Sequence, residues 1–344
     1  MPADHPPERL QVTAANMLVD AVSAEVAEAW QTAGLTGILL KGPSISRWLY
    51  ETPSQRPYVD SDFLVSPAEQ HACEDVLRGL GFAPDPVDEL QREIAQARNW
   101  RRHSDGAMVD LHRTLGAVEA PPERVWSVLA ASTEPMIVAR LRLRVLAIEA
   151  RALHVALHAL QHGIDGDKAV SDLRLALQRL PRDVWVAAAE LAEAIESRAA
   201  FAAGLRLLPE GQALADDMGL SERASLRVTL RRGSPGRLAL GYALVFDELR
   251  RGGLGAGARS IARKVVPSRE YMREWTPNAT GKKVGLIHAY LYRLVWLVKH
   301  SIRGLRLLNA TSSKREDSFY ILPLNGESEP PVGGTLQSDT DSVP

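Results

Sequence analysis

The chain has very little cysteine. Its 344 residues include a single one, Cys73, which excludes an internal disulfide framework and a metal cluster built on several cysteines. Aromatic residues are also sparse, at 6%. Hydrophobic residues make up 45% and charged residues 24%, which is typical of a globular protein. A chain of this length can bury a substantial core in one large domain or in two ordinary ones.

Long apolar segments are missing as well. The first ten residues, MPADHPPERL, contain no apolar stretch of the kind that a secretory signal needs. The apolar run at 286–298 is interrupted by His288 and Arg293, and it is shorter than the roughly 20 residues of a spanning helix. This run suits buried packing or a peripheral membrane contact. We therefore expect a cytoplasmic protein with no spanning membrane segment.

The net charge of −1 hides an unequal distribution of charge. Residues 221–310 carry 18 Lys and Arg against 5 Asp and Glu, whereas residues 1–220 carry 21 against 31. Residues 311–344 carry 2 against 6. The basic segment indicates either an anionic partner, such as RNA or a nucleotide's phosphates, or arginine-rich helical faces in solvent.

The first 148 residues mix helix and strand patterns. Apolar spacing predicts helices and short strands in alternation, at 8–33, 37–40, 44–50 and 58–65.

Turn signals place the next elements. Ser66, Pro67 and Glu69 form a capping-box pattern, which predicts a helix that starts there and ends at Gly79 or Gly81. Asp105-Gly106 predicts a hairpin between two strands.

From Glu149 onward the pattern is helical almost throughout. Breaks are expected at six Gly- or Pro-containing positions, near 163–167, 181, 209–211, 234–236, 252–257 and 277–281. The composition beyond residue 312 favours disorder. We predict an α+β protein with a mixed β-sheet domain at 1–148, a helical domain at 149–311 and a disordered acidic tail at 312–344.

Two aspartates lie one residue apart in a strand-like segment, YVDSDFLV. Asp60 and Asp62 would point to the same face of the strand and Ser61 to the other. Asp110, in MVDLH, would join them if its strand is adjacent. Such a cluster is explained either by divalent cations that neutralise it or by an exposed sheet edge where each carboxylate is solvated.

The ordered set of motifs resembles a known superfamily. A Gly and a Ser at a helix start, followed by Asp-x-Asp on one strand and a lone Asp on another, are similar to polymerase-β-like nucleotidyltransferases. More narrowly, LLKG, LY, Arg56-Pro57, DSDFLV and VDLH resemble an uncharacterised bacterial nucleotidyltransferase family. The resemblance continues through LHVALHALQHG, SDL, PSREYMREW and AYLYR, and so covers roughly residues 8–305.

The resemblance implies a role for each matching residue. Asp60 and Asp62 would hold two Mg²⁺ (or Mn²⁺) ions, and Asp110 would share the ion that activates the acceptor hydroxyl. Gly42 and Ser44 would approach the β- and γ-phosphates at a helix N-terminus. The sequence departs from the family at Pro43, which has no amide hydrogen to donate, and at Ser61, where isoleucine is usual.

Three further residues are candidates for the nucleotide site. Lys41 would contact the triphosphate or extend to solvent. Arg56 would pair with a phosphate, with Asp60 or with Asp62. His112 shares a strand face with Asp110 and would lie beside the metals.

A row of histidines has no fixed role. His154, His158 and His162 recur every four residues along one helix face. They are compatible with a cleft lining, with core packing or with a zinc site. Asp172 is either a helix-start residue or a cleft carboxylate.

The function that the resemblance implies is Mg-dependent transfer of a nucleoside monophosphate from an NTP, expected to be ATP. Pyrophosphate would be released, and the acceptor would be a small molecule, a peptide or protein, or RNA. The alternative is a degenerate nucleotide-binding or regulatory protein with the same fold, which the intact aspartates oppose and Pro43 favours.

Overall fold

A computed structural model describes residues 6–85, 96–163, 166–220, 269, 272 and 285–295. Residues 6–85 and 96–220 belong to one compact unit, and the helical residues 286–295 belong to a second. No helix within the described ranges combines the length and the apolar character needed to cross a membrane. The predicted tail at 312–344 and most of the basic segment lie outside the described residues.

The first unit is built on a mixed seven-stranded sheet of order β3-β4-β5-β2-β1-β7-β6. β1 pairs in parallel with β7 and β2 in parallel with β5, and the other neighbours are antiparallel. The strands are β1 (Gly37–Leu39), β2 (Ser61–Val65), β3 (Ala83–Pro84), β4 (Ala97–Arg101), β5 (Met108–His112), β6 (Thr133–Val138) and β7 (Leu141–Leu146).

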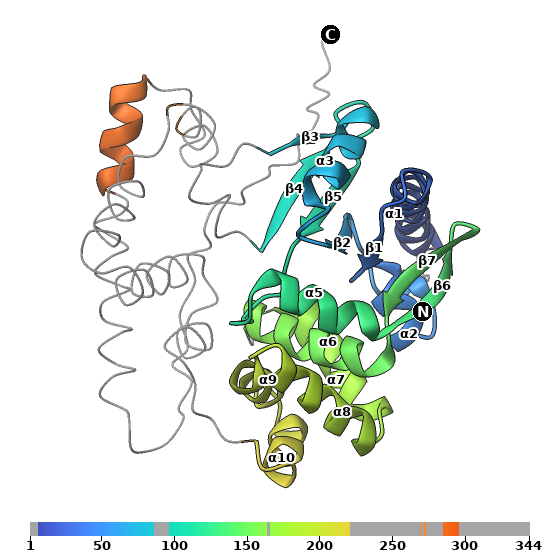
Figure 1. The fold of residues 1–344 in the computed structure, drawn as a ribbon, viewed down its shortest axis with the longest axis vertical. Helices are drawn as coiled ribbons and strands as arrows, with labels where there is room; N and C mark the ends of the chain where they lie inside the picture. The colour runs from blue at the N-terminus through green and yellow to red at the C-terminus, as the bar shows by residue number, and fades with distance from the viewer. Residues whose placement is uncertain are drawn as a thin grey trace. The chain divides into compact units, whose positions relative to one another are not determined.

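Helices cover both faces of this sheet (Figure 1). Figure 1 shows α5 to α10 grouped on one side of the strands, with α1 and α3 on the other. The helices are α1 (Pro6–Thr32), α2 (Pro43–Leu49), α3 (Gln70–Gly79), α5 (Pro122–Ala131), α6 (Ile148–His162), α7 (Asp167–Arg179), α8 (Arg182–Ala194), α9 (Arg198–Leu205) and α10 (Pro209–Asp217). The predicted α+β class is confirmed.

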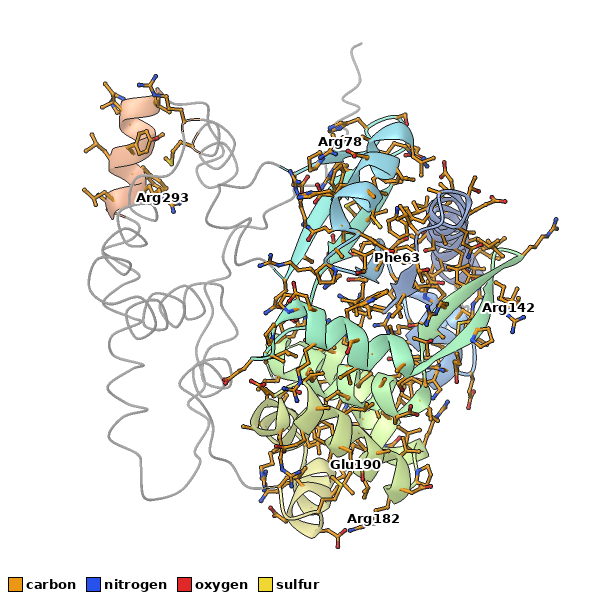
Figure 2. All side chains as sticks on the ribbon, viewed as in Figure 1. Phe63, Arg78, Arg142, Arg182, Glu190 and Arg293 are labelled. Atoms are coloured by element: carbon orange, nitrogen blue, oxygen red, sulfur yellow. The ribbon has the colours of Figure 1, made fainter. Side chains whose placement is uncertain are left out.

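Alternation along β2 divides the core in two. Phe63, labelled in Figure 2, belongs to the cluster beneath α1 and α3, where its ring meets the edge of Trp30 at 5.0 Å between centroids. Leu64 belongs to the cluster that contains the buried side of α6. Asp62 therefore shares the α6 face of the strand, since residues two apart point the same way.

Several expected elements are confirmed, with changes at their ends. The hairpin at Asp105-Gly106 joins β4 to β5, and Gly106 takes a positive φ of 75°. The capping box is wrong in position, because residues 67–69 form a turn and α3 begins at Gln70 without a side-chain cap. The break expected at 209–211 lies earlier, since Pro209 is the first residue of α10.

The pair β6–β7 and the helix α5 were not predicted. The two residues of the β6–β7 turn, Ala139 and Arg140, adopt positive φ angles of 44° and 72°. Such turns usually contain Gly or Asn, so the sequence gives no signal there.

Candidate metal and nucleotide site

Asp62 and Asp110 lie opposite each other on adjacent strands. β2 and β5 are parallel neighbours, and their register pairs Asp62 with Asp110 and Leu64 with His112. Ser61 points to the other face, where its hydroxyl lies 2.7 Å from that of Ser23 on α1. The sheet therefore brings the two carboxylates together as the sequence predicted.

Asp62 is a buried carboxylate with two partners. Lys41 Nζ lies 2.6 Å from its Oδ1, and His112 Nε2 lies 3.1 Å from the same oxygen. Burial alone would raise the pKa of Asp62, but the charge of Lys41 and the hydrogen bond from His112 hold it well below its usual range. Asp62 is therefore ionised throughout the physiological pH range.

The pKa of Asp110 is shifted in the opposite direction. Burial and the nearby charge of Asp62 raise its pKa to about 6. One ligand atom each from Asp62, Asp110 and His112 lie within 4.8 Å of one another. Two carboxylates and an imidazole at this spacing fit a divalent cation, because such an ion would relieve the repulsion that raises this pKa.

Asp60 lies one residue before β2 and is not a member of that group of three. Its backbone oxygen is close to Gly42, where a Cβ would come within 3.7 Å of it. Burial and the charge of Asp62 raise the pKa of Asp60 as well. Asp60 therefore borders the Asp62 site from the loop that precedes the strand.

The turn between β1 and α2 holds the predicted phosphate residues. Gly42 is the N-cap of α2 with φ 62° and ψ −120°, a conformation that is essentially restricted to glycine. Ser44 is fully buried, and its hydroxyl donates to the Leu40 carbonyl at 2.7 Å. The roles of Gly42, Ser44 and Lys41 toward phosphate stay predictions.

Arg56 makes a buried ion pair with Asp172 on α7. Its Nε and Nη2 donate to the two carboxylate oxygens of Asp172 at 2.8 and 2.7 Å. Tyr50 OH adds a third hydrogen bond to Asp172 Oδ1 at 2.8 Å. Both charged side chains are only 2% exposed. Asp172 thus lies inside α7, where it fixes the loop that leads to Asp60.

The same loop is held from α1 by residues that the sequence analysis missed. Asn16 Nδ2 donates to the carbonyls of Pro53 and Arg56, and the Tyr58 amide donates to Asn16 Oδ1. Tyr58 OH donates to Asp20 at 2.8 Å. Asn16, Asp20 and Ser23 form a polar stripe at helical spacing, and this stripe was the available signal.

The histidine row on α6 starts near the carboxylates. His154 is 6% exposed, and its Nδ1 has no hydrogen-bond partner in the described part of the chain. Burial and the charge of Lys41 lower its pKa to about 3. The ring of His158 follows at 6.1 Å and that of His162 a further 4.5 Å away, between centroids. Partial burial also lowers the pKa of His158, whereas His162 is exposed at the end of the row.

The solved structures that this chain resembles are distant ones. A search of curated proteins found no match. Among solved structures, the chain is similar to the antibiotic-resistance factor ANT(2'')-Ia, with 16% identity and a TM-score of 0.36 over 54% of this chain and 92% of that one. It is also similar to an antigenic nucleotidyltransferase-like protein from Paracoccidioides brasiliensis, with 13% identity and a TM-score of 0.33 over 52% and 92%.

A family described as uncharacterised nucleotidyltransferase matches residues 7–210. The match spans more than half of the chain and includes every candidate site residue from Lys41 to Asp172. The chain therefore belongs to this nucleotidyltransferase family.

Proposed function

We propose that the protein is a metal-dependent nucleotidyltransferase, which moves a nucleoside monophosphate from an NTP to an acceptor hydroxyl or phosphate and releases pyrophosphate. The observation that carries this proposal is the register pair Asp62–Asp110 with His112 beside it. Membership of the family supports the reaction class.

The residues of the site would have different roles in the reaction. Asp62, Asp110 and His112 would hold Mg²⁺ or Mn²⁺, with Asp60 as a further ligand from the preceding loop. When bound, such an ion lowers the pKa of an attacking hydroxyl and stabilises charge that develops on the α-phosphate. Asp110 is the residue best placed to accept the proton of that hydroxyl.

The phosphate end of the site lies at the β1–α2 turn. Lys41, Gly42 and Ser44 would receive the β- and γ-phosphates of the NTP, for which we propose ATP. In this proposal Arg56 shapes the loop before Asp60 instead of binding phosphate, because Asp172 occupies two of its nitrogens. Selection of the acceptor is assigned to residues 149–311, and a cytoplasmic location goes with the use of an NTP.

The test follows where the α-phosphate and the γ-phosphate of ATP go. Purified protein is incubated with a cell extract and Mg²⁺ or Mn²⁺, using ATP labelled at the α-phosphate in one arm and at the γ-phosphate in the other. Nucleotidyl transfer moves the α-label to an acceptor and leaves the γ-label in pyrophosphate. Sensitivity of the labelled product to ribonuclease or to protease then separates RNA, protein and small-molecule acceptors.

Matched variants locate the activity. Asp62→Asn and Asp110→Asn are expected to lower α-label transfer at least 100-fold, whereas Asp75→Asn on the exposed side of α3 should leave it unchanged. Transfer of the γ-label that requires the added protein, above the level in extract alone, would contradict the proposal. Metal-dependent ATP binding without transfer of either label would favour the degenerate nucleotide-binding protein.

A further inference from the structure

One carboxylate oxygen of Asp62 already has a cation as its partner. Lys41 Nζ lies 2.6 Å from Asp62 Oδ1. The Lys41 side chain is 20% exposed and that of Asp62 only 2%, so this contact lies at the inner end of the site. Lys41 and Asp62 come from neighbouring parts of the sheet, because Lys41 lies two residues after β1, which pairs with β2.

Lys41 and a metal ion compete for this oxygen in the observed geometry. Mg²⁺ binds carboxylate oxygens at about 2.0–2.1 Å. A cation at that distance from Oδ1, inside the group formed with Asp110 and His112, would lie within a few ångströms of Nζ. Two positive charges at such a separation repel strongly in a partly buried site. Lys41 therefore weakens metal binding for as long as it stays on Oδ1.

The NTP supplies a second place for the ammonium group. Lysine has a compact charge on a flexible stem, so it can exchange one anion for another by rotation of its side chain. Moving to solvent would cost Lys41 its partner, whereas moving to a phosphate replaces one anion by another. Gly42, the next residue, begins the turn where the triphosphate is expected. Metal and nucleotide therefore favour the same displaced position of Lys41.

We propose that Lys41 is the internal counter-ion of the metal-free site and that its transfer from Asp62 to the triphosphate couples the binding of metal and nucleotide. This inference rests on the proposed function. It implies weak metal binding by the nucleotide-free protein and mutual strengthening of the two ligands. By linkage, each ligand strengthens the other by the same factor.

The test compares two affinities in the full-length chain. Mn²⁺ binding without nucleotide is measured from the electron paramagnetic resonance signal of the free ion. ATP binding in EDTA is measured by calorimetry. Lys41→Gln is expected to tighten Mn²⁺ at least 10-fold and to weaken ATP at least 10-fold. These opposite changes are the signature of a shared counter-ion, since loss of folding would weaken both.

Two variants act as controls. Lys168 is another cation near Asp60, but its Nζ contacts the Pro57 carbonyl instead of Asp62. Lys168→Gln should therefore change Mn²⁺ affinity less than 3-fold. Lys41→Arg keeps the charge and should bind Mn²⁺ as weakly as the wild type. Melting curves in EDTA establish that each variant is folded.

The outcomes separate this inference from the function on which it rests. Equal Mn²⁺ affinity in the wild type and Lys41→Gln, with binding abolished by Asp62→Asn, would overturn the role of Lys41 and keep the metal site. Equal effects of Lys41→Gln and Lys168→Gln would reduce the effect to general electrostatics and also overturn it. Absence of Mn²⁺ binding in every variant would overturn the metal site, and the role of Lys41 with it.

Discussion

Two buried aspartates in this protein each face a cation, but the pairs are built differently. Asp172 accepts hydrogen bonds on both carboxylate oxygens from the rigid guanidinium of Arg56, and Tyr50 adds a third donor. Asp62 receives Lys41 and His112 on one oxygen, and Asp110 lies opposite in register. Each aspartate is only 1% exposed, so burial does not distinguish the two pairs.

The difference is in how completely each charge is satisfied. A planar guanidinium matched to a carboxylate is suited to a permanent contact, whereas a flexible ammonium group is suited to one that is exchanged. Asp60 and Asp110 add like charges beside Asp62, which favours the exchange of Lys41 for a divalent cation. A structural ion pair and a functional one can thus be separated by the geometry of the partners.

The same substitution in both pairs should give the largest effect. Asp172→Asn leaves the buried guanidinium of Arg56 without a counter-charge, and we expect it to lower the free energy of unfolding by about 3–5 kcal/mol. Asp62→Asn should cost only about 1 kcal/mol in EDTA, because Lys41 is partly exposed and repulsion with Asp110 is removed. Urea unfolding in EDTA measures both.

This expectation differs from the one that follows from the sequence alone. Without Lys41 in view, three clustered carboxylates predict that Asp62→Asn leaves the metal-free protein equally or more stable. An Asp62→Asn loss as large as that of Asp172→Asn would make the Lys41 contact a structural pair and remove the contrast. The double variant Arg56→Met/Asp172→Leu should recover most of the Asp172→Asn loss, since no buried charge is then left unpaired.

A pH series sharpens the contrast at Asp110. The pKa of Asp110 is raised to about 6 in the folded protein, whereas an unfolded Asp titrates near 3.9. Between about pH 4 and 6 the unfolded chain releases this proton and the folded one keeps it. This group therefore lowers the free energy of unfolding as pH rises through that window, by up to about 3 kcal/mol.

Asp110→Asn removes this pH-dependent contribution to the free energy of unfolding. Relative to the wild type in EDTA, the variant should be more stable above pH 6 and should differ little near pH 4. Saturating Mn²⁺ should raise the free energy of unfolding of the wild type above pH 6 to at least that of the variant. Parallel pH profiles for the two proteins in EDTA would mean that Asp110 is not under repulsion.

The smallest effect is expected on the opposite face of β2. Ser61→Ala removes one hydrogen bond to Ser23, whose hydroxyl also donates to the Val19 carbonyl at 2.8 Å. The loss should be about 1 kcal/mol or less, with Mn²⁺ affinity unchanged. A change in Mn²⁺ affinity would show that the two faces of the strand are not independent.

The site was more predictable than the network that supports it. Alternation and the adjacency of two strands were enough to place Asp62, Asp110 and His112 together, because strand geometry is local and periodic. The partner of Arg56 could not be predicted in the same way. Asp172 lies in another element, and no local pattern says which distant carboxylate a loop arginine meets.

The remaining misses have local physical causes. The β6–β7 pair lacks a glycine or asparagine at its turn, so the alternating residues of β7, LRLRVL, were not assigned to a hairpin. Ser66 offered a capping box that the chain does not use, because the turn at 67–69 delays the helix. The domain boundary expected at residue 148 stays a prediction; α6, which begins at Ile148, shares a core cluster with residues of the sheet.

The Arg56–Asp172 pair also has a consequence for synthesis on the ribosome. The two residues are 116 positions apart, so at 5–20 residues per second Asp172 is made roughly 6–23 s after Arg56. During that interval Arg56 lacks the carboxylate with which it pairs in the folded chain. A nascent chain that stops before α7 carries every proposed metal ligand but cannot complete their support. The metal site, encoded within the first third of the chain, therefore matures only after its midpoint has been translated.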